Sequence, residues 1–223
     1  MSEEKKEYPR PSLTADMVVL ALGAERGLRV LMVRRARDPF QGRWALPGGF
    51  VEPTETVAEA AGRELREETS LTGVHVEEIG CFSRPGRDPR GWVVTIAHLA
   101  LVPIDRLGEV KAGDDAAAAE WLDLTVAQGR VASLAWQGRA LPPDHALAFD
   151  HDEILAAAAR RLLVDPAHHA LSLVPGVFSL EALEAASLAL TGQPCSLEER
   201  VGSLPILETA PGSGLYRHRP GEG

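Results

Sequence analysis

The chain contains few of the features that mark several common protein classes. Its only cysteines, Cys81 and Cys195, lie far apart without CxxC or Cys/His spacing, so the sequence indicates neither a disulfide framework nor a zinc site. We expect both to pack as small hydrophobic residues. No apolar run approaches the roughly 18 residues that cross a bilayer, and the charged start is unlike a signal peptide. A cytoplasmic location without a membrane partner is therefore expected.

Positive charge is also scarce. The chain carries 23 Lys and Arg against 32 Asp and Glu, which gives a net charge of −9. Residues 1–150 hold 18 basic against 23 acidic side chains and residues 151–223 hold 5 against 9, so neither part is basic. With 45% hydrophobic and 25% charged residues, the 223-residue chain has the composition of a globular protein. Two unequal domains are expected.

Three carboxylates are predicted to share one face of a helix. We predict this helix at residues 55–69, with Thr54 as its N-cap. Glu64, Glu67 and Glu68 are spaced i, i+3, i+4, which brings side chains together on a helix. Clustered acids repel one another unless a cation lies among them. Mg²⁺ takes oxygen ligands and usually binds together with substrate phosphates, so we expect Mg²⁺ here, with Mn²⁺ as the alternative.

The stretch GGFVEPTETVAEAAGRELREETSL resembles the Nudix box of MutT-like hydrolases. The matching residues are Gly49, Glu55, Arg63, Glu64, Leu65, Glu67, Glu68 and Leu71. One position departs, because the late glycine of the pattern is Ser70. That residue would follow the helix C-terminus in a left-handed conformation, at a cost of about 1 kcal/mol.

The resemblance implies roles for the helix residues. Glu67 and Glu68 would be the chief metal ligands, Glu64 a ligand or general base, and Arg63 would orient a carboxylate. The catalytic set is thus Glu64, Glu67 and Arg63, and which carboxylate takes the proton stays open. The implied reaction is attack of water on a phosphorus of a nucleoside diphosphate derivative, which would give AMP and ribose 5-phosphate from ADP-ribose.

Glu52 and Glu55 lie at the predicted helix entrance. They could bind a second ion or merely complement the helix dipole. Asp114, Asp115 and Glu120 lie where Nudix enzymes sometimes keep a late catalytic acid, although a plain solvated loop is the preferred explanation.

Several arginines could clasp phosphate bidentately. Four precede the box and two follow it, the alternative being scattered surface charge: Arg34, Arg35, Arg37, Arg43, Arg87 and Arg90. We assign substrate binding to Arg34, Arg43, Arg87, Gly48 and Gly49.

Two aromatic residues and one histidine lie near these positions. Phe40 and Trp44 either stack on adenine or belong to the core. His151 is expected to cap or pack at a domain junction.

The remaining pattern predicts an α/β (α+β) fold, with a mixed sheet sandwiched by helices. Strands are expected at residues 17–22 and 28–33, joined as a hairpin, and at 44–46, 74–82, 93–102 and 119–122. A helix should run from Asp150 or His151 to Leu163. This arrangement agrees with the α/β/α sandwich that the Nudix resemblance implies.

The C-terminal part shows the element order of a winged helix. Ser179 caps a predicted helix at 180–190 that ends at Gly192, Ser196 and Glu199 form a capping-box pattern, and residues 206–209 and 215–218 form a hairpin. We therefore predict a disordered tail at 1–12, a Nudix domain at 13–148, a linking helix at 149–165 and a small winged-helix-like domain at 166–223.

The whole arrangement resembles the Nudix-related transcriptional regulators of NAD metabolism, which join an ADP-ribose-sensing Nudix domain to a winged helix. The resemblance also rests on DPFQGRWALPGGF, RDPRGW, AFDHDEIL and FSLEAL. It leaves two readings: a Mg²⁺-dependent hydrolase of ADP-ribose or a similar nucleotide, and an ADP-ribose-responsive, homodimeric DNA-binding regulator. Residues 171–223 offer DNA only Arg200, Arg217 and Arg219 against six acids, so the hydrolase is the preferred reading.

Overall fold

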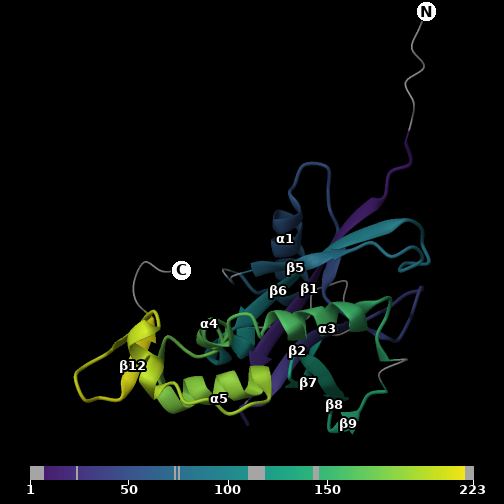
Figure 1. Cartoon of the computed structure of the whole chain (residues 1–223). Coiled ribbons are helices and arrows are strands. Elements are labelled where there is room, and N and C mark those ends of the chain that lie inside the picture. The colour runs from purple at the N-terminus through teal and green to yellow at the C-terminus, as the bar shows by residue number, and fades with distance from the viewer. Residues whose placement is uncertain are drawn as a thin grey trace, which may run out of the picture.

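The computed structural model of the chain describes residues 8–23, 25–72, 74, 76–109, 119–142 and 146–218, without the side chains of residues 198–200. Among these residues, nine strands form one mixed sheet in the order β5-β6-β1-β2-β7-β8-β9, with β3 beside β2 and β4 beside β1 (Figure 1). The strands are β1 Ser12–Leu22, β2 Leu28–Arg34, β3 Trp44–Ala45, β4 Gly48–Phe50, β5 Val76–Phe82, β6 Val93–Val102, β7 Ala119–Ala127, β8 Arg130–Trp136 and β9 Arg139–Ala140.

Strand β1 is the centre of this sheet. It pairs in parallel with β6 and antiparallel with β2 and β4. Both of its faces are buried, because alternate side chains belong to two separate apolar clusters. Met17 and Val19 pack toward helix α1 (Val57–Thr69), while Val18 and Leu20 pack toward helix α3 (His151–Arg161). Near-continuous apolar sequence is what a strand covered on both faces requires.

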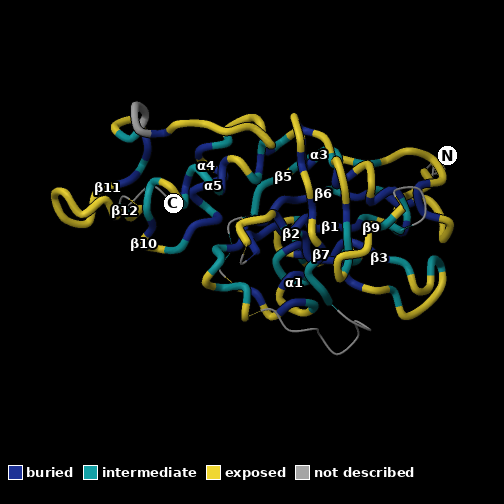
Figure 2. The backbone as a smooth tube through the Cα atoms, turned by 90° about the horizontal axis from the view of Figure 1, so that it is seen from below, coloured by how far each residue is buried: buried dark blue, intermediate teal, exposed yellow. Residues whose placement is uncertain are grey.

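The helices therefore cover opposite faces of the sheet. Figure 2 shows α1 and α3 on either side of the dark-blue central strands. The predicted α/β class with a sandwiched mixed sheet is confirmed, and so is the smaller C-terminal unit with its own sheet and helices.

The predicted strands and the first hairpin are present, with bounds that differ by a few residues. Strand β7 extends to Ala127 instead of ending at Leu122, because it pairs with both β2 and β8. Strands β4, β8 and β9 were not predicted.

The C-terminal unit consists of α4 Pro166–Leu171, β10 Val177–Ser179, α5 Leu180–Thr191, the 3₁₀ helix η2 Glu198–Ser203, β11 Ile206–Glu208 and β12 Leu215–His218. Its three strands are ordered β10-β12-β11. The hydroxyl of Ser179 caps α5 as predicted, and Gly192 ends it at φ 71°. Helix α4 and strand β10 were not predicted.

The second C-terminal helix differs from the prediction. Instead of an α-helix capped by Ser196, a six-residue 3₁₀ helix follows Leu197, which makes no side-chain cap. The residues before Pro205 are too few for a longer helix.

One apolar core joins the two units. Phe178, Leu183 and Leu190 of the C-terminal unit belong to the same cluster as Leu124 of the sheet and Leu162 after α3. The strands thus separate into two sheets while the core runs through both, and the predicted domain bounds stay a prediction. Residues 1–7 of the expected tail lie outside the described residues, and β1 begins at Ser12.

Both cysteines are exposed, so the prediction that they pack in the core was wrong. Cys81 lies on β5, an edge strand. The thiol of Cys195 donates to Ser187 Oγ at 3.1 Å. In the part of the chain that the structure describes, no helix combines the length and apolar character needed to cross a membrane.

The C-terminus of α1 carries a strained residue that offers a test of stability. Ser70 adopts φ 63° and donates its backbone N–H to Arg66 O at 2.9 Å. Glycine enters this left-handed region without a Cβ penalty. We expect Ser70→Gly to raise the free energy of unfolding by about 0.5–1 kcal/mol in chemical denaturation.

Gly192→Ser is the matched control at the end of α5. Its φ is 71°, and a Cβ there would lie 2.8 Å from Val126 O, so this change should destabilise the protein. A loss of stability in Ser70→Gly would show that the serine side chain contributes more than its backbone strain costs.

Glu77 of β5 ties the sheet to α3 and α4. It accepts from Arg161 Nη2 at 2.8 Å and contacts His169 Nε2 at 2.8 Å. Burial opposes ionisation of this carboxyl, but the hydrogen bond from Arg161 and the contacts of His169 outweigh it and lower the Glu77 pKa. The resulting stability is present above the unfolded pKa of about 4.3 and is lost as pH falls through the lower folded pKa.

We expect Glu77→Gln to lower the free energy of unfolding by about 1–3 kcal/mol at pH 7, with a smaller difference from wild type below about pH 4. Denaturant titrations across pH measure this. Glu153→Gln is the control, because Glu153 makes an exposed pair with Arg84, and it should change stability by less than about 1 kcal/mol. Equal effects of the two variants at pH 7 would contradict the assignment.

Candidate active site

Helix α1 presses its carboxylates against the backbone of β4. A Cβ at Gly49 would lie 2.0 Å from Glu64 Oε1, and a Cβ at Gly48 would lie 2.4 Å from Ala15 O. The N–H of Gly48 donates to Glu68 Oε2 at 3.0 Å. The two glycines of the PGGF turn therefore permit the close approach of strand and helix that places Glu64 and Glu68.

The N-terminus of α1 lies two residues beyond the predicted start. Thr56 is the N-cap, in a capping box with Glu59, instead of Thr54. Glu55 does not join the helix, because its carboxylate accepts from the backbone N–H of Glu52 at 2.9 Å and from Arg63. These bonds lower the pKa of Glu55 to about 2, with the Arg63 hydrogen bond as the largest cause.

Arg63 gathers the acidic side chains around itself. Its guanidinium lies 2.7 Å from Glu55, 2.7 Å from Glu64 and 3.3 Å from Glu67, and it donates to Phe50 O at 3.1 Å. The hydrogen bonds to Glu55 and Glu64 raise the pKa of Arg63. Arg63 thus contacts three carboxylates, and the orienting role that the Nudix resemblance implies for it stays a prediction.

Glu68 is half-buried and accepts from the backbone of Gly48. Burial raises its pKa to about 8, helped by the negative charge of Glu64, Asp16 and Glu67 and opposed by the bond from Gly48. Positive charge added near Glu68 would favour its ionised form, as the hydrogen bond from Gly48 already does.

The three predicted metal ligands suit a hard divalent cation in kind, since all offer carboxylate oxygens. Among the described residues, however, no group of three His, Cys, Asp or Glu is already close enough to hold an ion. Glu64 and Glu67 face the guanidinium of Arg63, and Glu68 faces Gly48. We conclude that the oxygen donors of these three residues fit Mg²⁺ or Mn²⁺. The guanidinium of Arg63 contacts two of them, Glu64 and Glu67.

A cavity of about 230 Å³ opens beside this helix. Four predicted site residues line it, namely Gly48, Gly49, Glu68 and Arg87. Two further lining residues, Arg35 and Arg90, were expected only as possible phosphate ligands. The charged and aromatic lining residues without any expected site role are Asp16, Phe50, Asp88 and Phe149. A lone acid in the apolar run of β1 was the signal for Asp16, since buried carboxylates need a reason.

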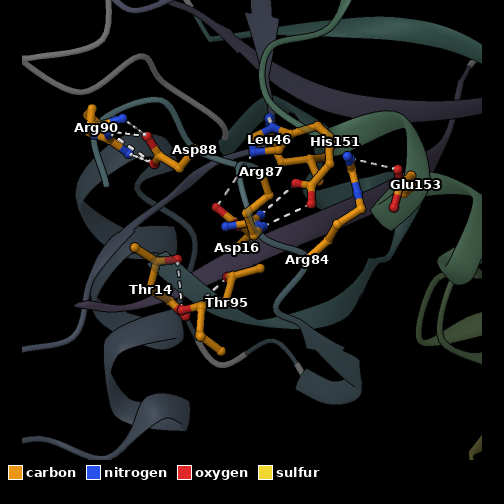
Figure 3. A network of polar contacts seen from close by, with 12 residues as sticks. Thr14, Asp16, Leu46, Arg84, Arg87, Asp88, Arg90, Thr95, His151 and Glu153 are labelled. Atoms are coloured by element: carbon orange, nitrogen blue, oxygen red, sulfur yellow. Dashed lines mark hydrogen bonds and ion pairs between the residues drawn. The ribbon is translucent and has the colours of Figure 1, made fainter. Parts of the chain in front are cut away.

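Buried ionic contacts among Asp16, Arg87 and His151 line this cavity (Figure 3). Arg87, whose side chain is 3% exposed, donates to both oxygens of Asp150 at 2.8 and 2.6 Å and lies 3.6 Å from Asp16 Oδ2. Arg87 therefore lines the cavity with its guanidinium already committed to Asp150. These contacts give it a positioning role, and direct substrate binding by Arg87 stays a prediction.

His151 belongs to the same network. It is buried and accepts at Nδ1 from the N–H of Leu46 at 2.8 Å. Burial lowers its pKa, so the imidazole is neutral at pH 7 and carries its proton on Nε2. Packing at the start of α3 agrees with the role expected for His151.

Arginine and aromatic side chains form another part of the cavity lining. The Arg90 guanidinium carbon lies 5.1 Å from the Phe50 ring centroid and 5.2 Å from that of Phe149, and Arg35 lies 4.8 Å from Phe149. Arg90 is held by Asp88, whose carboxylate accepts its Nη2 at 2.6 Å. Phe149 has φ 55°, a sparsely populated conformation that occurs at functional sites.

Two predicted substrate residues do not line the cavity. Arg34 donates to Gly42 O at 3.2 Å, and its guanidinium lies 5.9 Å from the Trp44 ring centroid. Arg43 lies over Phe40 at 5.3 Å. Trp44 is buried at 5% exposure against Trp136, which supports its reading as a core residue.

The late acids do not complete the cavity. Glu120 lies on β7 and accepts from the indole N–H of Trp136, and Asp114 and Asp115 lie outside the described residues. Of the three arginines predicted for DNA, only Arg217 has a described side chain. It is exposed on β12, between Val177 and Leu207 of the neighbouring strands, while the side chain of Arg200 and all of Arg219 lie outside the described part.

A larger cavity of about 500 Å³ lies between β8 and α3. Its lining is mainly apolar and contains none of the predicted site residues. Four predicted site residues line the smaller cavity and none lines this one, so the smaller cavity is the candidate site.

Comparison with known proteins agrees with this geometry. The chain is 40% identical over 149 residues to a Methanocaldococcus jannaschii protein named ADP-ribose pyrophosphatase. The aligned region covers 66% of this chain and 73% of the relative. It is 32% identical over 185 residues to the ADPR responsive transcriptional repressor NtrR of Acinetobacter baylyi, covering 81% of this chain and 67% of that protein.

A MutT/nudix family protein from Enterococcus faecalis has a similar structure. It superposes with a TM-score of 0.84 at 31% identity, covering 97% of this chain and 89% of the other. The NUDIX domain model matches residues 12–143, which include the sheet, the carboxylate helix and most of the cavity. The chain belongs to the Nudix family.

Proposed function

We propose that this protein is a divalent-cation-dependent hydrolase that cleaves the pyrophosphate of ADP-ribose or a related nucleoside diphosphate derivative. The observation that carries the proposal is the position of Glu64, Glu67 and Glu68 on one helix, beside a cavity walled by arginine and phenylalanine. The relative from M. jannaschii that is named ADP-ribose pyrophosphatase supports the choice of substrate.

In the proposed reaction, water attacks one phosphorus and the bond from that phosphorus to the bridging oxygen breaks. A glutamate takes the proton of the water, and ADP-ribose yields AMP and ribose 5-phosphate. Glu64 and Glu67 are the candidate bases. Arg63 contacts one oxygen of each, which leaves the second oxygen of either residue to accept a proton.

Glu64, Glu67 and Glu68 would hold the Mg²⁺ or Mn²⁺ ion. When bound, such an ion neutralises phosphate oxygens and lowers the pKa of water. The contribution of the chain is positional: Gly48 and Gly49 let the carboxylates approach β4, and Arg63 keeps Glu64 and Glu67 on one side of the helix.

Binding of the nucleotide would fall to the cavity wall. Arg35 and Arg90 offer guanidinium groups to phosphate oxygens, while the rings of Phe50 and Phe149 offer flat apolar surface to a base. These residues replace Arg34 and Arg43 in our assignment, because Arg35 and Arg90 line the cavity.

Replacing one carboxylate tests the hydrolase. With ADP-ribose and Mg²⁺, we expect wild type to release AMP and Glu67→Gln to reduce kcat by about 10²–10⁴-fold, because the amide neither binds a cation as a carboxylate does nor accepts a proton. Chromatography of the nucleotide products measures both rates.

Glu109→Gln is the control for this assay. Glu109 pairs with Arg106 away from the cavity, so the variant should keep wild-type activity. If ADP-ribose raised the Tm of the wild type but were recovered uncleaved in the presence of Mg²⁺, the hydrolase proposal would be wrong for this substrate.

A second candidate function is regulation of transcription. It is favoured by the repressor from A. baylyi, whose similarity extends over 81% of this chain. The acidic C-terminal unit and the short 3₁₀ helix η2 oppose it, because a recognition helix needs length and basic side chains to enter the major groove. In this reading the protein would act as a homodimer on a two-fold site.

We expect selection from a pool of random DNA duplexes to enrich no sequence. Enrichment of a palindromic site by the wild type and not by Arg217→Glu would establish the regulator. Light scattering on the same preparation would then be expected to give twice the 23.9 kDa chain mass.

A further inference from the structure

Asp16 is the charged side chain of the small cavity that remains without a hydrogen bond. Each of the others has one: Arg35 with Pro39 O, Glu68 with Gly48, Arg87 with Asp150, and Asp88 with Arg90. Within the part of the chain that the structure describes, no donor lies within hydrogen-bonding distance of the Asp16 carboxylate. Yet the residue is only 8% exposed and lines the cavity.

Two neighbours lie just beyond hydrogen-bonding distance of Asp16. Arg87 Nη2 forms an ion pair with Oδ2 at 3.6 Å, and His151 Nε2 lies 3.9 Å from Oδ1. Because His151 is neutral, it adds no charge there. Gly48 brings its backbone close on the same side, where a Cβ would lie 2.8 Å from Oδ1, so the missing side chain at Gly48 leaves the carboxylate open toward the cavity.

A buried carboxylate costs free energy unless donors reach it. An ionised carboxylate only accepts hydrogen bonds, so its partner in the cavity must bring a donor. Phosphate oxygens do not qualify, because they would repel Asp16. In a nucleoside diphosphate linked to a sugar, the vicinal hydroxyls of ribose are donors next to the phosphates.

We propose that Asp16 accepts a hydrogen bond from a ribose hydroxyl of the bound nucleotide and so determines selectivity for the sugar. The proposal rests on the nucleotide chemistry of the proposed function and deepens it. Phe50 and Phe149, which offer ring surface to a base, line the same cavity as Asp16.

The first test measures binding and does not depend on cleavage. Isothermal titration calorimetry in EDTA compares ADP-ribose with analogues that lack one hydroxyl of the adenosine ribose or one of the terminal ribose. We expect the wild type to bind one of these analogues about 10–100-fold more weakly than ADP-ribose. The analogue that loses affinity identifies which of the two sugars contacts Asp16.

In Asp16→Asn, the affinity for ADP-ribose should fall by a similar factor and the preference over that analogue should shrink to about twofold or less. If a lower Tm shows that Asp16→Asn alters folding, Asp16→Ala is measured in its place. It should show the same loss of affinity and of preference. Asp88→Asn is the matched control: its carboxylate lines the same cavity but is already bonded to Arg90, so its effect should be equal for all of these ligands.

Three results would overturn the proposal. The first is an equal loss of affinity for every ligand in Asp16→Asn. The second is that Asp16→Asn changes the preference for ADP-ribose over its inosine analogue, which lacks the adenine amino group, and not over the analogues that lack a ribose hydroxyl. The third is that the wild type binds none of these nucleotides. Product analysis with Mg²⁺ separates failure of the ribose-contact proposal from failure of the hydrolase proposal. ADP-ribose that is bound in an Asp16-dependent way but never cleaved would refute the hydrolase and keep the ribose contact.

Discussion

The pairing of Arg87 with Asp150 is the contact on which the site depends. Both oxygens of Asp150 accept from one guanidinium, at 2.8 and 2.6 Å, inside the protein. This pair joins the loop after β5 to the start of α3, which otherwise share no backbone ladder. Buried ion pairs contribute little net stability, but breaking one costs about 3–5 kcal/mol because the remaining charge is left buried. Its main effect is therefore to fix position.

Three neighbouring features depend on that position. Phe149 precedes Asp150, and its backbone at φ 55° directs the ring into the cavity. Asp88 follows Arg87 and holds Arg90 over Phe149. His151 follows Asp150 and binds the N–H of Leu46, just before the glycine turn. The loop after β5, the start of α3 and the residues before β4 are thus held beside the carboxylate helix by the buried side chains of Arg87, Asp150 and His151.

The parts of the site that arise from local sequence could be predicted, and those that arise from contacts between distant segments could not. The i, i+3, i+4 spacing of the glutamates and the left-handed Ser70 follow from helix geometry alone. The start of α1 was misplaced because Glu55 is held by Arg63, eight residues away, and this competition has no local signature. Strand β10 has three residues, so its pairing with β12 defines it more than its composition does.

The cavity wall shows the same limit. Arg34 and Arg35 are adjacent in sequence and equally suited to phosphate. Strand β2 ends at Arg34, and only Arg35, which follows it, lines the cavity. Asp16 could be noticed in the sequence as a lone acid in an apolar strand. Its neighbours Arg87 and His151 come from segments about 70 and 135 residues away, so its role could be inferred only once they were placed.

The charges around the cavity also limit how it can attract a nucleotide. Arg87 and Arg90 are balanced by Asp150 and Asp88, and Arg35 lies next to Arg90, where burial lowers its pKa. Such a cavity has little free positive charge with which to draw in a diphosphate from solution. Arg87 and Arg90 are instead preorganised, because Asp150 and Asp88 fix their guanidinium groups before a ligand arrives, and preorganised donors lose less entropy on binding. Selectivity would then come from shape, ring stacking and single hydrogen bonds more than from net charge, which makes the open carboxylate of Asp16 the most informative group in the cavity.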